Sequence, residues 1–325
     1  MAISQPRSAC RILVFTSPQA GTGHGDGQVA RLVALLRAQQ CEVEVIDAIA
    51  ALRLRSGPEA VDRPQVVVAA GGDGTLTLVA QTCSADTRIV PLPLGTENLV
   101  ARHFGITADA SAVADVILRG TDRRIDAGIA GGRLFLAMAS CGFDAEVVRG
   151  MHLTRRGHIN RFSYAGPIVR AMRRYRFPEL RIELTRGVQG VSESIIGRWA
   201  MVFNLPRYAG ALGIEPSARD DDGQLDLIVL RHGGLAGGFR YLAGVALRRH
   251  IHWRDVVRIP VTGCRITSAS PVAFQIDGDY GGRLPLEVRV APGRVCLRVP
   301  PLAAGWTIAG DDADERLAES SVTCG

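Results

Sequence analysis

The hydrophobic and polar positions of the first third of the chain predict strands that alternate with helices. Short runs that are almost wholly apolar are typical of strands buried on both faces of a sheet. Between them, apolar residues recur at helical spacing, as at Val113, Val116 and Ile117. This alternation favours a parallel sheet covered by helices on both faces. The predicted strands are 11–16, 42–46, 66–70 and 88–92, and the predicted helices are near 29–36, at 75–82, from 96 onward and at 111–118.

The pattern changes near residue 122, after which most segments are strand-like. Two such runs flank Gly131 and Gly132, which is typical of a β-hairpin. One basic helix is predicted over 158–176 and another helix over 235–249. The second region is therefore expected to be mostly antiparallel. Its further predicted strands are 180–185, 196–205, 225–231, 256–261, 264–270, 272–277 and 286–291.

Composition indicates a folded protein with more than one core, because the chain has 325 residues and is 47% hydrophobic and 22% charged. The net charge of +6 favours phosphates, anionic lipid or nucleic acid without choosing among them. All 38 residues of the lysine and arginine class are arginine. A Walker A loop, a protein-kinase strand lysine and a Schiff-base amine are therefore excluded. Phosphate binding would depend on backbone amides, metal and arginine.

The seven cysteines are scattered and form no CxxC pair, so neither a metal framework nor disulfides are expected. No apolar run reaches 18 residues, and the first one is too short for a signal peptide. We expect a cytoplasmic protein whose membrane contact, at the inner membrane surface, is at most peripheral.

The stretch VVVAAGGDGTLTLVA, residues 66–80, places three glycines and one carboxylate after a buried strand. Glycine lets backbone N–H groups approach an anion, and Asp73 could hold Mg²⁺ or accept a proton. The alternative is a plain strand–turn–helix connection. Two more loops, 17–25 and 94–98, also follow strands, and parallel strands would bring all three loops to one sheet edge. A nucleotide site is favoured, although the first loop fails the dinucleotide pattern G-x-G-x-x-G.

Five motifs occur in order: GGDGT, PLGTENLVARHFGI, CGFDAEV, DDGQLDL and QIDGDY. Together they resemble the diacylglycerol kinase catalytic family, which includes bacterial lipid kinases and sphingosine and ceramide kinases and is related to NAD kinases. The resemblance covers about residues 11–300. It implies a three-layer α/β nucleotide domain with a parallel sheet, an antiparallel β-sandwich domain, and an active site between them. We accordingly expect the α/β domain at 10–126 with a return after about 296, the sandwich at 127–295, and a frayed tail at 304–325.

The resemblance also implies ATP and Mg²⁺ as cosubstrates and assigns residues to them. A structural Mg²⁺ would bind the carboxylate of Asp222 and the carbonyl oxygens of Arg219 and Gln224, although the same segment reads equally well as a solvated acidic turn. Asp279 stands where the family has the glutamate taken as general base, and Asp73 is the competing candidate. The residues expected at the ATP phosphates are Gly71, Gly72, Asp73, Gly74, Thr75, Leu76, Thr77, Gly95, Thr96 and Glu97.

Two residues depart from the family pattern. Asp279 is one methylene shorter than glutamate, and a misplacement of about 1 Å can cost on the order of 100-fold in rate. Leu99 occupies a position where bacterial lipid kinases often carry an aspartate that helps to hold Mg²⁺. Glu97, two residues earlier, is a candidate substitute, and sphingosine-kinase-like members also lack that aspartate.

Two arginine-rich segments leave a choice open. Residues 149–177 carry eight arginines and no acid, and the helix predicted at 235–249 ends in Arg248 and Arg249. The favoured interpretation is a helix packed on one face and solvated on the other, and the alternative is a helix that faces anionic lipid. No aromatic or recognition motif supports nucleic-acid binding. A homodimer is left open.

The leading hypothesis is an ATP-dependent lipid kinase that transfers the γ-phosphate to a hydroxyl of a membrane lipid, either diacylglycerol or a sphingoid base. One alternative is an NAD kinase-like activity on a soluble substrate. The other is a catalytically impaired lipid-binding regulatory protein, which the departures at Leu99 and Asp279 motivate. The sequence does not indicate which lipid is the acceptor.

Overall fold

The computed structural model describes residues 10–16, 24–154, 175–185, 194–208, 212–247 and 249–301. The chain forms two units. Unit 1 comprises Met1–Ile125 with Gly293–Trp306, and unit 2 comprises Asp126–Pro292 with Thr307–Gly325. Most of the first glycine-rich loop, most of the basic segment 149–177 and the predicted tail 304–325 lie outside the described residues.

Unit 1 is built on a parallel sheet whose strands have the order β2-β1-β3-β4. Ile12 is in register with Val66, and Val66 is in register with Arg88, so the three central strands run alongside one another. The end of β18 adds a fifth parallel strand through Cys296 and Leu297. The strands are β1 (Arg11–Thr16), β2 (Glu42–Ile46), β3 (Val66–Gly71), β4 (Arg88–Pro93) and β18 (Leu286–Val299).

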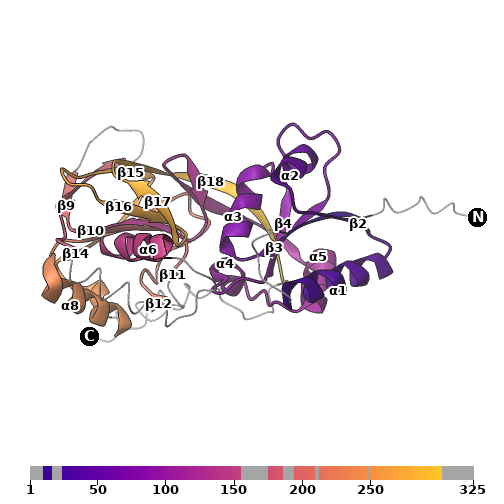
Figure 1. Cartoon of the computed structure of the whole chain (residues 1–325), viewed down its shortest axis with the longest axis horizontal. Coiled ribbons are helices and arrows are strands. Elements are labelled where there is room, and N and C mark those ends of the chain that lie inside the picture. The colour runs from indigo at the N-terminus through magenta and orange to yellow at the C-terminus, as the bar shows by residue number, and fades with distance from the viewer. Residues whose placement is uncertain are drawn as a thin grey trace, which may run out of the picture. The chain divides into compact units, whose positions relative to one another are not determined.

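Helices cover both faces of this sheet, α1 beside α5 on one face and α2 beside α3 on the other (Figure 1). In α5, Val113, Val116 and Ile117 are buried while Asp115 and Arg119 are exposed, as expected for a two-sided helix. The three-layer prediction is confirmed. The helices are α1 (His24–Ala38), α2 (Ile49–Ser56), α3 (Asp73–Thr82), α4 (Leu99–His103) and α5 (Ala110–Arg119).

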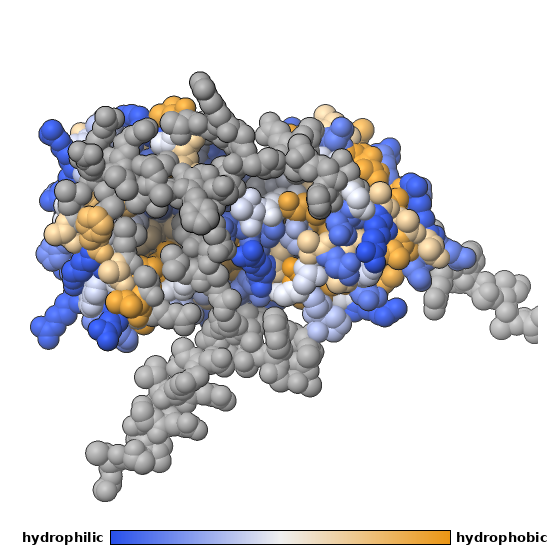
Figure 2. Space-filling model, turned by 60° about the horizontal axis from the view of Figure 1, so that its bottom comes forward, coloured by the Kyte–Doolittle hydropathy of each residue, from blue (hydrophilic) through white to orange (hydrophobic). Residues whose placement is uncertain are grey.

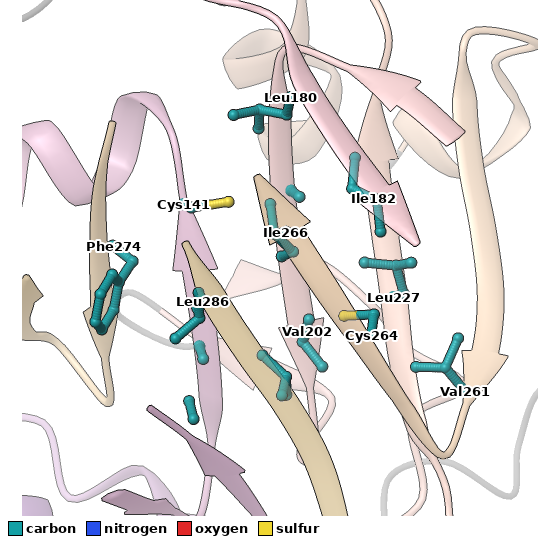
Figure 3. Close-up of a cluster of buried hydrophobic side chains, with 14 of the residues drawn as sticks. Cys141, Leu180, Ile182, Val202, Leu227, Val261, Cys264, Ile266, Phe274 and Leu286 are labelled. Atoms are coloured by element: carbon teal, nitrogen blue, oxygen red, sulfur yellow. The ribbon is translucent and has the colours of Figure 1, made fainter. Parts of the chain in front are cut away.

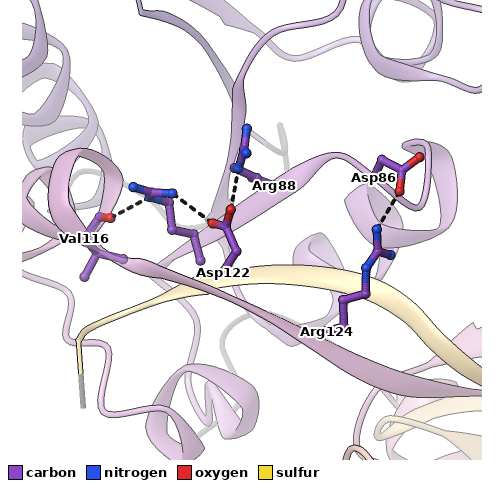
Figure 4. Close-up of polar contacts among 6 residues, drawn as sticks. Asp86, Arg88, Val116, Asp122 and Arg124 are labelled. Atoms are coloured by element: carbon purple, nitrogen blue, oxygen red, sulfur yellow. Dashed lines mark hydrogen bonds and ion pairs between the residues drawn. The ribbon is translucent and has the colours of Figure 1, made fainter.

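An ion-pair cluster ties β4, β18 and the start of β5 (Thr121–Ala130) to α5 (Figure 4). Asp122 accepts hydrogen bonds from Arg88 at 2.6 Å and from Arg298 at 2.8 Å. The same Arg298 guanidinium donates to the carbonyl of Val116 at 3.2 Å. Pairs this exposed contribute about 0–1 kcal/mol each, so the cluster mainly sets how the returning strand β18 lies against β4.

Among its described residues, unit 2 has two large antiparallel sheets and a separate pair of short strands, β11 with β12. One has the order β14-β13-β10-β7-β16-β17, and in the other β18 pairs with β15, β15 with β8, and β8 with β9. The strands are β5 (Thr121–Ala130), β6 (Arg133–Phe135), β7 (Met138–Cys141), β8 (Leu180–Thr185), β9 (Ser194–Gly197), β10 (Trp199–Phe203), β11 (Arg207–Tyr208), β12 (Leu212–Gly213), β13 (Leu225–Leu230), β14 (Val256–Val261), β15 (Gly263–Thr267), β16 (Ala273–Ile276) and β17 (Asp279–Arg283).

The core of unit 2 lies between these sheets (Figure 3). Ile182 and Ile266 from one sheet face Val202 and Leu227 from the other, and all four are buried. Alternate residues of each strand supply this layer, which is the pattern of a β-sandwich. The predicted sandwich is confirmed, and so is the hairpin at Gly131 and Gly132, whose φ values of 55° and 81° suit a type I′ turn.

The continuous strand predicted over 196–205 is wrong. The chain bends at Arg198, so that β9 pairs with β8 in one sheet and β10 pairs with β13 in the other. Gly197 permits this crossing, because a Cβ there would lie 2.2 Å from Cγ1 of Val229. A hydrophobicity pattern does not reveal such a change of sheet, since both sides of the bend remain buried.

Among the residues of unit 2 that the structure describes, helical segments occur in three places. They are α6 (Phe143–Thr154), α8 (Gly234–Ala246) and η2 (His250–His252). The sequence did not predict α6 or α2, and the helix predicted over 235–249 ends at Ala246.

On the face shown in Figure 2, apolar and polar residues are interspersed. Within the described ranges, no helix is both long and apolar enough to span a bilayer.

Candidate active site

The GGDGT loop is a tight turn between β3 and α3. The amides of Thr75 and Leu76 donate to the carbonyl of Gly72 at 3.0 and 3.1 Å, which closes the first turn. A Cβ on Gly71 would lie 2.2 Å from Oγ1 of Thr75. Glycine at residue 71 is therefore required by the packing of the threonine side chain. The amides of Asp73 and Gly74, the first two of α3, have no earlier carbonyl of the helix to bond to, and Gly74 is exposed.

The second predicted loop lies against the first. The amide of Leu94 donates to the carbonyl of Gly71 at 2.9 Å. A Cβ on Gly95 would lie 2.5 Å from Cα of Gly72, so the two backbones meet where neither residue has a side chain. Parallel pairing of β3 with β4 produces this contact at the carboxyl edge of the sheet.

Asp73 joins the two loops. Its carboxylate accepts hydrogen bonds from the amides of Leu99 at 3.0 Å and Val100 at 3.3 Å, one on each oxygen. Burial raises the pKa of Asp73, and the two donating amides partly oppose that shift. Asp73 thus stabilises the start of α4. Because the bonds come from backbone amides, leucine at position 99 supports this contact as well as an acidic residue would.

The helix predicted from residue 96 begins at Leu99 instead. Asn98 has φ 48°, the left-handed region, and its side-chain amide donates to the carbonyl of Gly95 at 2.8 Å. Its side-chain oxygen accepts from the Gly95 amide at 3.1 Å. This local ring of bonds holds the Gly95 segment in a loop and delays the helix by three residues.

The predicted phosphate-contact residues differ in exposure, and the partly exposed ones are Gly72, Asp73, Thr77 and Glu97. Gly74, Gly95 and Thr96 are exposed at the edge where the loops meet. Thr75 and Leu76 are buried, so their side chains belong to the packing of α3 against the sheet. Ligand contacts at these two positions would come from the backbone.

In unit 2, QIDGD forms the hairpin turn between β16 and β17. Asp277 and Gly278 have φ values of 47° and 86°, which suit a type I′ turn. The carboxylate of Asp277 accepts from three successive amides, those of Leu136, Ala137 and Met138, at 2.9, 2.9 and 3.0 Å. The turn is therefore held on a segment about 140 residues earlier in the chain.

A second set of contacts holds the same turn through Gln275. Its side-chain oxygen accepts from the amide of Gly278 at 2.8 Å, and its side-chain nitrogen donates to Oγ of Ser140 at 2.9 Å. Ser140 in turn donates to Asp144, which also accepts from Trp199 Nε1 at 2.7 Å. Burial raises the pKa of Asp144. The sequence contained Asp144 within CGFDAEV but did not indicate this network.

Asp279, the predicted general base, lies on the turn that the hydrogen bonds of Asp277 and Gln275 hold in place. It begins β17 and is exposed, although Asp277 and Gln275 on the same turn are engaged in hydrogen bonds. Its carboxylate is thus accessible to a ligand. Asp279 belongs to unit 2 and the GGDGT loop to unit 1.

The predicted structural metal turn lies before β13. Oδ1 of Asp222 accepts from the amide of Gln224 at 2.9 Å, and Gly223 donates to the buried Asp126 at 2.6 Å. Burial raises the pKa of Asp226 to about 7, and the neighbouring carboxylates of Glu215 and Asp222 add to the shift. Among the residues that the structure describes, no three His, Cys, Asp or Glu side chains are grouped to hold a metal.

Family models match both units. The model described as diacylglycerol kinase catalytic domain matches residues 11–130, and that described as YegS C-terminal NAD kinase beta sandwich-like domain matches residues 137–299. The chain belongs to the diacylglycerol kinase family. The predicted family is thus confirmed, and this family member is a kinase that phosphorylates an alcohol, with a catalytic domain of the lipid-kinase type.

Curated relatives of this family member are named diacylglycerol kinase. A diacylglycerol kinase of Staphylococcus aureus strain bovine RF122 / ET3-1 is 26% identical over 262 residues, which is 78% of this chain and 81% of the relative. That of strain JH9 is 27% identical over 227 residues, covering 68% and 70%.

Solved structures share the fold. A diacylglycerol kinase from Bacillus anthracis str. Sterne superposes with a TM-score of 0.68 at 20% identity, covering 91% of this chain and 99% of the other. Yeast NADH kinase complexed with NADH gives a TM-score of 0.52 at 12% identity, covering 98% and 90%. At these identities the likeness concerns the fold, and it agrees with the predicted fold class.

Proposed function

We propose that this family member transfers the γ-phosphoryl group of ATP to the hydroxyl of a membrane lipid, with diacylglycerol as the first candidate. The observation that carries the proposal is the accessible carboxylate of Asp279 on a turn fixed by Asp277 and Gln275. Within the part of the chain that the structure describes, no hydrogen bond engages the Asp279 carboxylate, and a free carboxylate on a fixed turn suits a general base. The curated relatives named diacylglycerol kinase support the choice of acceptor.

ATP fits the loop edge of unit 1 for a steric reason. Gly72 and Gly95 let the two loops meet backbone to backbone, and the exposed Gly74 adds no side chain to the first turn of α3 beside them. Backbone amides at a helix N-terminus favour phosphate oxygens. With no lysine in the chain, these amides supply the contacts that a Walker A lysine would otherwise share.

Mg²⁺ fits the turn at 219–226 by charge. Burial is the main cause of the raised pKa of Asp226, and repulsion from Glu215 and Asp222 adds to it. A divalent cation held by Asp222 and the carbonyl oxygens of Arg219 and Gln224 would reduce that repulsion. A separate Mg²⁺ that accompanies ATP would supply neutralisation of phosphate charge. Asp279 accepts the hydroxyl proton as the lipid oxygen attacks the γ-phosphorus, and the bond from that phosphorus to the β,γ-bridging oxygen breaks to release ADP.

Asp73 has a different role in this proposal. Both of its oxygens already accept backbone amides, and burial raises its pKa. We therefore assign it to holding the two loops together, and we assign the proton to Asp279.

The test is phosphorylation by the purified chain of mixed micelles that contain diacylglycerol, a sphingoid base and ceramide, with NAD in a parallel reaction. Labelled ATP and Mg²⁺ are supplied to both. We expect label in diacylglycerol, and its loss in Asp279→Asn but not in Asp115→Asn, an exposed aspartate on α5. Label in NAD alone would replace the proposal with the soluble-substrate alternative. Lipid binding without ATP binding would replace it with the regulatory one.

A further inference from the structure

Helix α8 exposes an apolar face. Its sequence GLAGGFRYLAGVA contains one charged residue, Arg240. Ala236, Phe239, Ala243 and Leu247 recur at helical spacing and are all exposed, Phe239 to 61% and Leu247 to 67%. A helix on the surface of a soluble domain normally places polar residues there, as α5 does with Asp115 and Arg119. We call these four residues the α8 stripe.

The opposite side of α8 is what attaches it to unit 2. Tyr241 is 1% exposed, and the Trp253 ring packs on Gly244, where a Cβ would lie 2.4 Å from the ring. The Phe177 ring similarly lies 3.1 Å from the position of a Cβ on Gly238. Small residues let the helix sit close on this side. The packing thus leaves the α8 stripe outside the core.

Hydrogen bonds fix the rotation of the helix. Asp255 accepts from the hydroxyl of Tyr241 at 2.5 Å and from both terminal nitrogens of Arg240 at 2.5 and 2.9 Å. The Arg240 guanidinium also lies 3.9 Å from the centre of the Trp253 ring. These bonds hold the pKa of Asp255 well below its usual range. The single charge of α8 is therefore paired, and the stripe cannot turn inward without breaking the pair.

Arginines that form no ion pair with any residue the structure describes flank α8 in the sequence. The chain from Arg231 to Arg254 contains no acidic residue, and the first acid, Asp255, is the one paired with Arg240. Arg231, Arg249 and Arg254 are exposed, and so are His232 and His252. An apolar stripe flanked by arginines is complementary to a bilayer that carries anionic headgroups.

We propose that α8 docks this enzyme on anionic lipid bilayers. The α8 stripe enters the region between headgroups and acyl chains, and Arg231, Arg249 and Arg254 bind lipid phosphates. A second copy of the chain fits less well, because two such faces would bring like charges together. This goes beyond the proposed function and is independent of it, since docking requires neither ATP nor catalysis.

Co-sedimentation with vesicles tests the proposal without nucleotide. The full chain is mixed with vesicles of phosphatidylcholine alone or with added phosphatidylglycerol. We expect binding to the anionic vesicles that weakens with salt. Phe239→Glu and Leu247→Glu should each weaken it by about tenfold or more. The control is Leu54→Glu, since Leu54 is a leucine on α2 that is 75% exposed.

Substitutions of the arginines test the electrostatic contribution to vesicle binding. Arg231→Gln and Arg249→Gln should each weaken vesicle binding about fivefold, because a cation near an anionic surface contributes on that order. Arg119→Gln on α5, whose side chain is 76% exposed, is the matched control. Unchanged melting temperatures would show that the variants remain folded.

Three results would overturn the proposal. The α8 variants could bind vesicles as the unaltered chain does, or the chain could bind neutral and anionic vesicles equally. Alternatively, Phe239→Glu could convert a dimer to monomers with vesicle binding retained, which would make this face a self-association surface. Vesicle binding that depends on α8 together with no lipid phosphorylation would uphold the docking and reject the proposed function.

Discussion

The two aspartate–glycine turns of this protein, GGDGT at 71–75 and QIDGD at 275–279, use the same residues to different ends. In the first, the only carboxylate is partly buried and accepts hydrogen bonds from the amides of Leu99 and Val100. In the second there are two carboxylates. Asp277 accepts three backbone amides, and Asp279 remains exposed.

In both turns, one motif aspartate is fully engaged in hydrogen bonds to backbone amides and serves the structure. Asp73 and Asp277 each hold a distant backbone segment in place, and both do so with bonds to amides that any residue could supply. A turn of this kind presents a carboxylate to a substrate only if it contains a second aspartate whose side chain accepts no backbone amide. On this reasoning we propose that QIDGD carries the general base and that GGDGT shapes the loops that would bind the nucleotide.

The largest expected effect is on catalysis by Asp279. Asp279→Asn should lower kcat by about a thousandfold, within the usual range for loss of a general base. Its stability should stay within about 0.5 kcal/mol of the unaltered chain, because the side chain is exposed. Initial rates at saturating ATP measure kcat, and denaturant unfolding measures the free energy of unfolding. A loss from Asp73→Asn that greatly exceeds that from Asp279→Asn would reverse the assignment.

Asp277→Asn should damage stability and rate together. The amide nitrogen replaces one accepting oxygen, so at least one of the amides at 136–138 loses its partner. We expect a destabilisation of about 1–3 kcal/mol, with a fall in kcat and little change in KM. Denaturant unfolding and steady-state kinetics check this. An active, fully stable Asp277→Asn would show that the turn needs no such support.

Glycine-to-alanine substitutions should affect the two turns for different reasons, a steric clash at Gly95 and an unfavourable φ at Gly278. Gly95→Ala places a Cβ 2.5 Å from Cα of Gly72 and should force the loops apart, with a cost of about 1–3 kcal/mol and weaker ATP binding. Gly278→Ala meets no atom within 4 Å, and only its φ of 86° opposes the change, at about 1 kcal/mol. Calorimetry with ATP and thermal unfolding distinguish them. Equal loss of ATP binding in both variants would contradict the comparison.

The smallest effect concerns the pH dependence of stability. Burial raises the folded-state pKa of Asp73 above its ordinary value of 3.8, so the folded chain binds more protons than the unfolded chain between the two values. The Asp73 contribution to stability is then lost as pH rises from about 3.8 through the folded pKa. Asp73→Asn should flatten that decline. Unfolding free energies across this window test it, and an unchanged slope would assign the dependence to other groups.

Local periodicity was sufficient for most of the elements. The buried runs that became β1, β3 and β4 and the two-sided pattern of α5 depend only on residues close in sequence. Helix α2 was missed because only Leu52 and Ser56 are buried, which leaves almost no period to detect. The division of 196–205 into β9 and β10 was missed because it depends on which sheet each half meets.

The sequence alone determined the family, the two kinds of unit and the residues that could carry chemistry, because these depend on local pattern and on the order of motifs. It left open whether Asp73 holds metal, takes a proton or shapes the loop. Only the tertiary structure decided which carboxylates accept backbone amides, since the donors lie 26 residues from Asp73 and about 140 from Asp277. It likewise showed that the apolar side of α8 faces outward, because burial depends on neighbours that the pattern of one helix cannot specify.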